Sequence, residues 1–429
     1  MNILFCEEPT CLIDKFVPTV NNFNIFFKCY CYDNFKVDKK DKVEIKSLVP
    51  ESTYYQNQSL HIIDDLNLIP IENKDIRNIF SDLDFLSISK KMLSNTLNSD
   101  QKNLLKKLYL TKLDNYQPDI IFCFNHMNKI FNELYPKALV LSVESGIFSR
   151  VPFMSTLFYD PCGISQFSFL NKYKKEIQKF EISKEQNDTI NNFKQELVSI
   201  IDQNNPFSEQ IQEYVSKFRY NVLVPLQFLG IPNVEVETDF KSFFEYMSYI
   251  MDNIPEDIGV FVTQHMLYQS LNAGMLMYFR EKYPNFIFLD DLHYKSDTVP
   301  SLYLFKYVDA VFNICSQAGF MGLLWDKKII SFGKSFNNLI KDSDDIHNIE
   351  KVLESPTKSK NNIIYWLFTH YYIFQKDIFK KNWIYDYLKI KLSKYQKQEI
   401  NFSYFEQIND IEDICNYIIS SVKSFYSNK

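Results

Sequence analysis

The sequence predicts an α/β protein with two Rossmann-like, doubly wound halves and a helical C-terminal tail. Short apolar runs alternate with helical patterns twice, within residues 1–143 and again within 221–332, and a long charged helical pattern at 165–219 separates the two series. Strands that alternate with helices form βαβ units around a parallel sheet. Two such halves are expected to hold a ligand in a cleft between them, at the carboxyl ends of their strands.

The first half is predicted to contain both strands and a helix. Leu104, Leu105, Leu108 and Leu110 recur at helical spacing and predict a helix at residues 100–113. Short apolar runs predict strands at residues 2–5, 24–30, 119–124 and 138–143.

The segment at 165–219 is predicted to be a helical connector. Ile190, Phe193 and Leu197 recur every three or four residues, which is the spacing of one face of a helix. We assign this connector to a first, Rossmann-like domain that spans residues 1–215.

The second half is predicted to be a second Rossmann-like domain at residues 216–345. Apolar runs predict strands at residues 221–226, 259–263, 286–289, 310–313 and 328–332. Helical patterns lie between them at residues 240–251, 269–282 and 318–325.

The tail at 346–429 is rich in Tyr, Phe and Lys and is predicted to be helical and to pack back on both domains. Within it, residues 376–397 carry seven lysines interleaved with aromatic and aliphatic side chains. Such a helix can lie on an anionic membrane surface. It can equally bury its aromatic side against the protein and expose its lysines, which is the interpretation we favour.

Composition excludes several classes of protein. The 429 residues carry 47 Lys and Arg against 53 Asp and Glu, a net charge of -6, which disfavours nucleic acid as a partner. No apolar run approaches the roughly 20 residues of a membrane span, and the N-terminus lacks the pattern of a signal peptide. The eight cysteines lie mostly in apolar stretches, as reduced core thiols do. A cytoplasmic protein is expected.

Glycine is scarce and confined to one part of the chain. An average usage of about 7% would correspond to about 30 glycines, whereas the chain has 8, all between Gly146 and Gly333. Codon bias toward AT explains the depletion, and the glycines that remain are then expected where the backbone requires them. Catalytic or binding residues are therefore sought in this window.

The strongest local signal is a strand that runs into a helix start at residues 309–325. Ser316 stands at an N-cap position, Gly319 permits close approach to the backbone, and the free amides of the first turn are expected to bind phosphate or carboxylate. A plain capped turn explains the same residues and stays an alternative.

Two further strands end in polar side chains. The strand at 259–263 leads into Gln264 and His265, and an imidazole at this place can donate to phosphate or act as an acid or base. The strand at 138–143 leads into Glu144, a candidate general base or acid that we expect to face Ser316. A loop histidine and a solvated glutamate are the corresponding alternatives.

Other motifs are absent or weak. The sequence has no G-x-G-x-x-G, no Walker A motif and no G-x-S-x-G elbow, which disfavours dinucleotide oxidoreductases, P-loop NTPases and α/β-hydrolases. Cys29 and Cys31 lack a second ligand pair at zinc spacing. No metal site is predicted.

Taken together, these segments resemble the bacterial capsule polysaccharide biosynthesis family, which includes the β-Kdo glycosyltransferases (Kdo is 3-deoxy-D-manno-oct-2-ulosonic acid). The resemblance rests on the order of five elements. They are E-x-G at 144–146, D-P-x-G at 160–163, V-P-x-Q at 224–227, a strand-to-His element at 264–265, and S-x-x-G-F at 316–320 with Phe332-Gly333 behind it.

The resemblance implies a GT-B-like, metal-independent glycosyltransferase that takes an acidic sugar, such as Kdo, from a CMP-activated donor and transfers it to a glycan or glycolipid acceptor. No further cofactor is implied. The domain at 1–215 would be the acceptor-side domain, and the domain at 216–345 would bind the nucleotide sugar. Glu144 would act on the acceptor, with Gly146 and Asp160 as acceptor-side or structural residues, and His265 would contact the phosphate or the sugar carboxylate. Gln227, Gln264, Ser316, Gln317 and Gly319 would bind the donor.

Two positions depart from the pattern of the family. Relatives carry an acid after the V-P-x-Q strand, where Ile231 stands here, and Glu235, Glu237 or Asp239 would have to replace it. The His element of relatives reads K-x-H-P, and Thr263 stands in place of the lysine. A catalytically silent relative that binds nucleotide or glycan, and an epimerase or hydrolase on the same scaffold, are therefore alternatives. Contact of the lysine-rich tail with the inner face of the membrane is left open.

Overall fold

The computed structural model describes residues 1–7, 43–51, 67–124, 128–148, 150–227, 232–265, 269–378, 380, 382–397 and 400–428. The chain forms two compact units, and each is described by itself. The first unit comprises Met1–Glu144, Leu157–Phe169 and Ile373–Tyr404, and the second comprises Ser145–Thr156, Leu170–Tyr372 and Phe405–Lys429.

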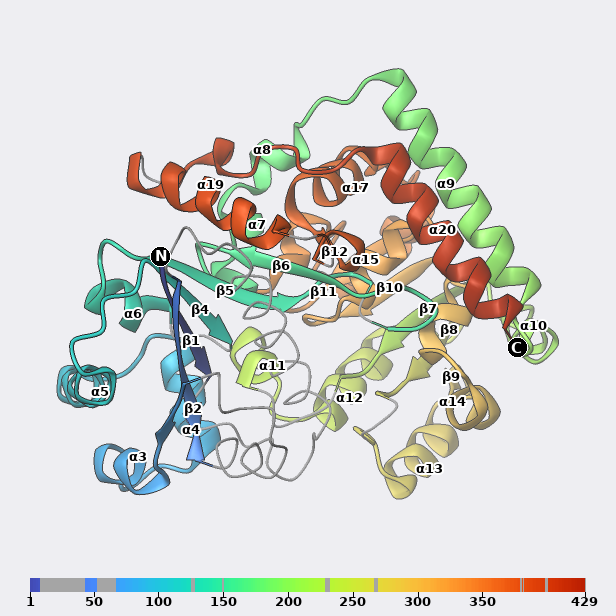
Figure 1. The fold of residues 1–429 in the computed structure, drawn as a ribbon. Coiled ribbons are helices and arrows are strands. Elements are labelled where there is room, and N and C mark those ends of the chain that lie inside the picture. The colour runs from blue at the N-terminus through green and yellow to red at the C-terminus, as the bar shows by residue number, and fades with distance from the viewer. Residues whose placement is uncertain are drawn as a thin grey trace. The chain divides into compact units, whose positions relative to one another are not determined.

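The first unit is built on a seven-stranded sheet with the order β12-β6-β5-β4-β1-β2-β3 (Figure 1). Its strands are β1 (Asn2–Glu7), β2 (Glu44–Pro50), β3 (Leu68–Ile71), β4 (Ile120–Phe124), β5 (Leu139–Ser145), β6 (Thr156–Asp160) and β12 (Ile373–Phe374). β1 pairs in parallel with β2 and β4, β2 with β3, and β4 with β5. This is the strand order of a doubly wound sheet.

The helices of the first unit are α3 (Asn73–Ile79), α4 (Phe85–Leu93), α5 (Ser99–Leu113), α6 (Asn128–Leu134), α18 (Gln375–Ile378) and α19 (Trp383–Lys397), with short 3-10 turns at Ser165–Phe167 and Phe402–Tyr404. A capping box between Asn98 and Gln101 explains where α5 begins. From α5, Leu105, Tyr109 and Leu113 are buried in the core of this unit.

The second unit is built on a five-stranded sheet with the order β11-β10-β7-β8-β9. Its strands are β7 (Tyr220–Pro225), β8 (Ile258–Thr263), β9 (Phe286–Ile287), β10 (Ala310–Asn313) and β11 (Lys328–Ser331). All four neighbouring pairs run in parallel. The apolar, fully buried sequences of β8 and β10 are typical of strands covered on both faces.

The helices of the second unit are α7 (Phe169–Lys172, which begins at the unit border), α8 (Lys174–Gln178), α9 (Lys184–Gln203), α10 (Ser208–Val215), α11 (Pro232–Glu237), α12 (Phe243–Asn253), α13 (Ala273–Lys282), α14 (Asp290–Lys295), α15 (Ala318–Leu323), α16 (Ile349–Glu354), α17 (Asn361–Trp366) and α20 (Ile411–Ser427). A π-helical turn covers Leu367–Tyr371, and 3-10 turns cover Pro300–Tyr303, Phe305–Tyr307, Phe336–Leu339 and Ile346–Asn348. Helices α9 and α20 lie side by side (Figure 1).

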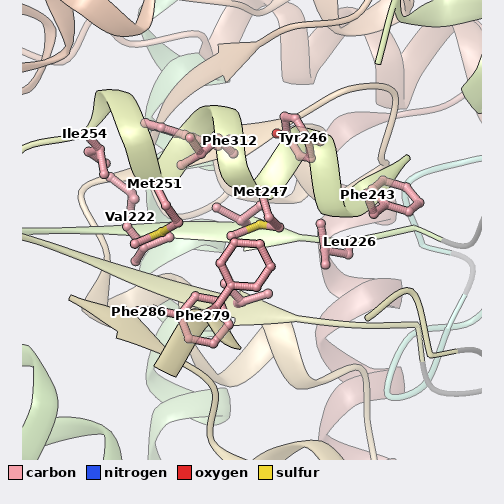
Figure 2. Packing of buried hydrophobic residues seen from close by; sticks show 14 of the residues in the cluster. Val222, Leu226, Phe243, Tyr246, Met247, Met251, Ile254, Phe279, Phe286 and Phe312 are labelled. Atoms are coloured by element: carbon pink, nitrogen blue, oxygen red, sulfur yellow. The ribbon is translucent and has the colours of Figure 1, made fainter. Parts of the chain in front are cut away.

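The core of the second unit lies between its sheet and helices α12 and α13. Figure 2 shows Met251 of α12 beside Val222 of β7. Phe279 of α13 stacks on Phe286 of β9 with ring centroids 5.3 Å apart. Burial of side chains of this size contributes roughly 1.5–3 kcal/mol each, so this face of the sheet is held chiefly by apolar packing.

Most predicted elements are confirmed. The strands at 2–5, 119–124 and 138–143 are β1, β4 and β5, the helix at 100–113 is α5, and four of the five second-half strands are found within about a residue of their predicted ends. The fifth is shorter, because β9 ends at Ile287 and α14 begins at Asp290. The strand predicted at 24–30 and the Cys29 and Cys31 pair lie outside the described residues.

The division into units differs from the predicted boundaries. The connector is helical as predicted, but from Leu170 onward it belongs to the second unit and not to the first. The tail is divided, because Ile373–Tyr404 belongs to the first unit while the flanking segments belong to the second. Strand β12 explains this division, since it extends the sheet of the first unit.

Helix α19 buries its apolar side, as the favoured interpretation of the lysine-rich segment predicts. Ile384, Tyr387 and Leu388 are buried and Lys389 is exposed. Lys391 departs from that pattern, because it is buried and its Nζ donates to the carbonyl oxygen of Tyr404 at 2.8 Å. Within the described ranges, none of the helices has the length and apolar composition that crossing a membrane requires.

Candidate functional site

The strand order of the second unit predicts a ligand-binding crevice between β7 and β10. The order reverses there, because β8 and β9 follow on one side of β7 while β10 and β11 lie on the other. In open parallel sheets, ligands bind at the carboxyl ends of the strands at such a point. The candidate site is therefore built from the residues that follow these strands.

Residues from the two strand ends contact each other. The Cys315 thiol, two residues after β10, donates to Oε1 of Gln227, two residues after β7, at 3.2 Å. Burial raises the pKa of the Cys315 thiol, and the nearby Glu237 carboxylate raises it further. Cys315 is therefore a protonated hydrogen-bond donor that orients Gln227, and not a nucleophile.

The helix start after β10 differs from the predicted geometry. The N-cap of α15 is Gln317, one residue later than predicted, and Ser316 precedes it. Ser316 Oγ accepts the N–H of Ala318 at 3.2 Å, and the Ser316 carbonyl accepts the N–H of Gly319 at 3.1 Å. The expectation of free amides in this turn is thus wrong for Ala318 and Gly319, because the chain itself already binds them.

Gly319 is needed for side-chain packing at this turn. A Cβ on Gly319 would lie 2.5 Å from Asn337 Oδ1 and 2.8 Å from Asn313 Nδ2. Both asparagines are buried, and Asn337 Nδ2 donates to Asn313 Oδ1 at 2.8 Å and to the Ser316 carbonyl at 3.1 Å. Asn313 and Asn337 therefore support the backbone at Ser316, a role that the sequence did not reveal.

Gln317 connects this turn to the segment Ser145–Thr156. Its Nε2 donates to the Ser145 carbonyl at 3.1 Å, and its Oε1 is buried with no hydrogen-bond partner in the described part of the chain. The E-x-G segment thus reaches the second unit through Ser145. Glu144 itself is the last residue of the first unit and half-buried, and its expected position opposite Ser316 stays a prediction.

Gly146 connects the two ends of the segment Ser145–Thr156. Its N–H donates to the Thr156 carbonyl at 2.9 Å. A Cβ at this position would overlap Thr156 Oγ1 and would lie 2.9 Å from the ring of Tyr372. The glycine of the E-x-G element therefore allows a close approach of backbone and side chains.

His265 follows β8 and lies beside an arginine. Nη2 of Arg150 is 3.5 Å from Nε2 of His265. Burial, with the positive charge of Arg150 as the second cause, lowers the pKa of His265 to about 4. The imidazole is therefore neutral near pH 7, and it can donate one hydrogen bond and accept another.

Gln264 is buried next to His265 and is incompletely bonded. Only 3% of the residue is exposed, and its Oε1 accepts the N–H of Leu271 at 2.6 Å. Its Nε2 is buried and has no hydrogen-bond partner among the described residues. A buried amide donor without a partner costs free energy, which a ligand oxygen or a water molecule would offset.

Asp160 shapes a turn in the first unit. Its fully buried carboxylate accepts the N–H groups of Cys162 at 2.8 Å, Gly163 at 3.2 Å and Phe169 at 2.7 Å. Gly163 adopts a φ of 137°, in a region that favours glycine. These contacts and this φ account in structural terms for the Asp and the Gly of the D-P-x-G element.

The comparisons with known proteins come to the same family as the motifs. Residues 164–376 match the family model described as capsule polysaccharide biosynthesis protein. This match covers 213 of the 429 residues, just under half of the chain. No curated protein matches the sequence.

Solved structures that match this chain include two of Thermosulfurimonas dismutans KpsC. The β-Kdo 2,7 transferase matches at 14% identity and a TM-score of 0.41 over 79% of this chain and 97% of that one. The β-Kdo 2,4 transferase matches at 13% identity and a TM-score of 0.40, over 70% of this chain and 87% of that one. A Methanocaldococcus jannaschii UDP-GlcNAc 2-epimerase matches at 12% identity and a TM-score of 0.34, over 85% of this chain and 96% of that one. The fold assignment itself rests on the two strand orders given above.

The family match covers the second-unit elements of the motif series. Gln227, the pair Gln264 and His265, and Ser316 all lie within residues 164–376, whereas E-x-G and D-P-x-G precede that segment. Ile231, at the position where the family carries an acid, lies outside the described residues. Of the three acids that could replace the missing one, Glu237 is fully buried, Glu235 is half-buried and Asp239 is exposed.

The residue that the sequence analysis missed most clearly is Arg150. It lies 115 residues before His265 in the chain, in a segment without periodic pattern. One signal was available: the chain has four arginines among its 47 basic residues. A codon bias that favours lysine makes each remaining arginine a candidate for a specific role.

Proposed function

We propose that this capsule-synthesis protein is a glycosyltransferase that transfers an acidic sugar, such as Kdo, from a CMP-activated donor to a saccharide acceptor of a surface polysaccharide. The observation that carries the proposal is the reversal of the strand order between β7 and β10. There Gln227 and Cys315 contact each other, within the segment that matches the family. Its position is the one at which parallel sheets bind nucleotides.

The donor would lie on the second unit. Gln227, Ser316, Gln317 and Gly319 would surround the nucleotide, and Gln264 and His265 would contact the phosphate or the sugar carboxylate. In support, Gln264 Nε2 and Gln317 Oε1 are buried without partners in the described part of the chain. Such groups fit a ligand that supplies both oxygen acceptors and hydroxyl donors.

The reaction needs one bond broken and one formed. The bond between the anomeric carbon and the phosphate oxygen would break, and CMP would leave with the bonding electrons. The acceptor hydroxyl would attack the same carbon, and Glu144 would take its proton as general base. We infer that no metal is required. The stereochemical course is left open, because the family's acidic position falls at Ile231.

A second candidate is a catalytically silent relative that binds nucleotide or glycan during polysaccharide assembly or export. Ile231 at the acidic position and the bonded amides of Ala318 and Gly319 favour it. Cytoplasmic localisation, with peripheral contact of the lysine-rich tail with the membrane, stays a prediction under both candidates.

Turnover separates the two candidates. The purified chain would be incubated with CMP-Kdo and capsule oligosaccharide acceptors, and the products would be analysed by mass spectrometry with and without acceptor. The proposal predicts CMP release and an acceptor that gains one Kdo residue. Absence of turnover, with nucleotide binding retained, would favour the silent relative, and donor breakdown without acceptor would indicate a hydrolase.

A further inference from the structure

Arg150 differs from the other three arginines of the chain. Arg219 pairs with Glu354 at 2.6 Å, Arg280 pairs with Asp290 at 2.6 Å, and Arg77 donates to the Leu83 carbonyl at 3.2 Å. Within the described ranges Arg150 forms no ion pair, and its contact is with the ring of His265. An exposed guanidinium beside a neutral ring keeps its charge available for an anion.

The segment that carries Arg150 is held in place from three sides. Gln317 donates to the Ser145 carbonyl, and the backbone N–H of Gly146 donates to the Thr156 carbonyl. From α20, Ser421 Oγ donates to the Pro152 carbonyl at 3.1 Å. These anchors flank Arg150 within the same unit and hold the backbone that carries it, from which the guanidinium reaches the ring of His265.

The position of Arg150 compensates for a charge that the sequence lacks. The family resemblance predicts a lysine two residues before His265, and this chain has Thr263 there, 4% exposed. Arg150 places a cation at the same imidazole from a different part of the chain. Unlike lysine, the guanidinium can donate two parallel hydrogen bonds to a phosphate or carboxylate.

We propose that Arg150, together with Gln264 and His265, binds an oxyanion of the donor, either its phosphate or the carboxylate of its acidic sugar. The identity of the ligand rests on the proposed function, whereas the anion site rests on these three residues. Arg150 supplies the charge beside the His265 ring, and Gln264, the residue before His265, has a buried Nε2 without a partner among the described residues. If the ligand is the sugar carboxylate, the site favours donors of acidic sugars over donors of neutral sugars.

The test compares binding by the full chain and its Arg150 variants. Inorganic phosphate, CMP and free Kdo would each be titrated by calorimetry and by following the ring NMR signals of His265, which are assigned with His265→Asn. Arg150→Gln removes the charge, Arg150→Lys keeps it, and Arg219→Gln is a matched control at an exposed arginine on the same unit. Thermal melts check that all variants fold.

The proposal predicts that Arg150→Gln lowers the affinity for at least one of the three ligands by about tenfold or more. Arg150→Lys would lose less, and Arg219→Gln would bind like the wild type. Loss for CMP alone assigns the phosphate, and loss for Kdo alone assigns the sugar carboxylate. Equal binding by Arg150→Gln and the wild type would overturn the proposal.

The outcomes also separate this proposal from the proposed function. If the wild type binds phosphate through Arg150 but neither CMP nor Kdo, the anion site stands and the donor assignment is wrong. If the wild type binds CMP and the Arg150 variants bind it equally well, the donor assignment stands and Arg150 has no part in it. No binding of any of the three ligands by the wild type would contradict both.

Discussion

The strand ends of the two units carry side chains of different electrostatic character. In the second unit, β7, β8 and β10 lead into uncharged amides and an imidazole: Gln227, Gln264, His265 and Asn313. In the first unit, β1, β5 and β6 lead into carboxylates: Glu7, Glu144 and Asp160. An edge of neutral donors with Arg150 nearby suits an anionic ligand, whereas an edge of carboxylates suits hydroxyl groups and their protons.

The two edges also use their polar groups differently. The Asp160 carboxylate accepts hydrogen bonds from three backbone N–H groups, so this acid of the first unit has a structural role. In the second unit, Gln264 and Gln317 each keep one buried polar atom without a partner among the described residues. The two glutamines therefore keep atoms that a ligand could bind, whereas the Asp160 carboxylate supports the fold of its turn.

Glu144→Gln gives the largest expected effect and tests the carboxylate edge. If Glu144 is the general base, the rate of transfer falls by about 10²–10⁴-fold, while CMP affinity is unchanged because the donor edge is intact. Steady-state kinetics with an oligosaccharide acceptor and calorimetry with CMP measure the two quantities. A variant that transfers at the wild-type rate would remove Glu144 from the reaction.

Gln227→Glu would give the donor edge a carboxylate. The substitution preserves size and the acceptor for the Cys315 thiol, but it places a negative charge beside the proposed phosphate. We expect CMP affinity to fall by about tenfold or more. Gln212→Glu, at an exposed position on α10, makes the same change in net charge and should bind CMP normally. Calorimetry measures the CMP affinity of both variants. Equal CMP affinities for Gln227→Glu and Gln212→Glu would show that the nucleotide binds elsewhere.

Asp160→Asn separates structure from function at the carboxylate edge. The asparagine side chain keeps one acceptor oxygen. Its NH₂ group, a donor, would face backbone N–H groups whose hydrogen bonds the Asp160 carboxylate accepts in the wild type. We expect the free energy of unfolding to fall by about 2 kcal/mol, with CMP affinity of the folded protein unchanged. Urea denaturation and calorimetry measure both, and wild-type stability would show that the turn holds without this charge.

Gly319→Ala tests the packing beneath the donor edge. The added methyl group would meet Asn313 and Asn337, so we expect a loss of about 1–3 kcal/mol in the free energy of unfolding. Gly274→Ala in α13 is the matched control, because its Cβ would meet only Asn272 Oδ1 at 3.5 Å and the helix gains propensity. Urea denaturation should rank the control at or above the wild type. The reverse ranking would contradict the packing described for Gly319.

The sequence predicted regular elements well where one pattern dominates. The apolar runs that became β8 and β10 and the capped pattern of α5 have no competing interpretation. β2 was missed because its sequence, EIKSLVP, mixes charged and apolar residues, and β12 was missed because two residues cannot interrupt a helical pattern visibly. Both strands depend on pairing with distant segments.

The candidate site was predicted only as far as strand ends reveal it. His265 and Gln227 follow strands and were found, but Arg150 and Asn337 reach the site from loops whose positions depend on tertiary contacts. Ser316 was found, although its amides were expected to be free and are bonded by the chain itself. The local sequence is therefore enough to predict which strand ends carry the site. The contacts that bring Arg150 to His265 depend on the tertiary fold and could not be predicted from it.

The central claim is that the crevice of the second unit holds a CMP-activated donor. A calorimetric titration with CMP, with UDP and GDP as controls and a repeat on Ser316→Ala, tests it most directly. The account predicts selective binding of CMP that is weakened or lost in the Ser316 variant, whose melting temperature is checked in parallel. Preference for UDP or GDP, or CMP binding that Ser316→Ala leaves unchanged, would contradict it.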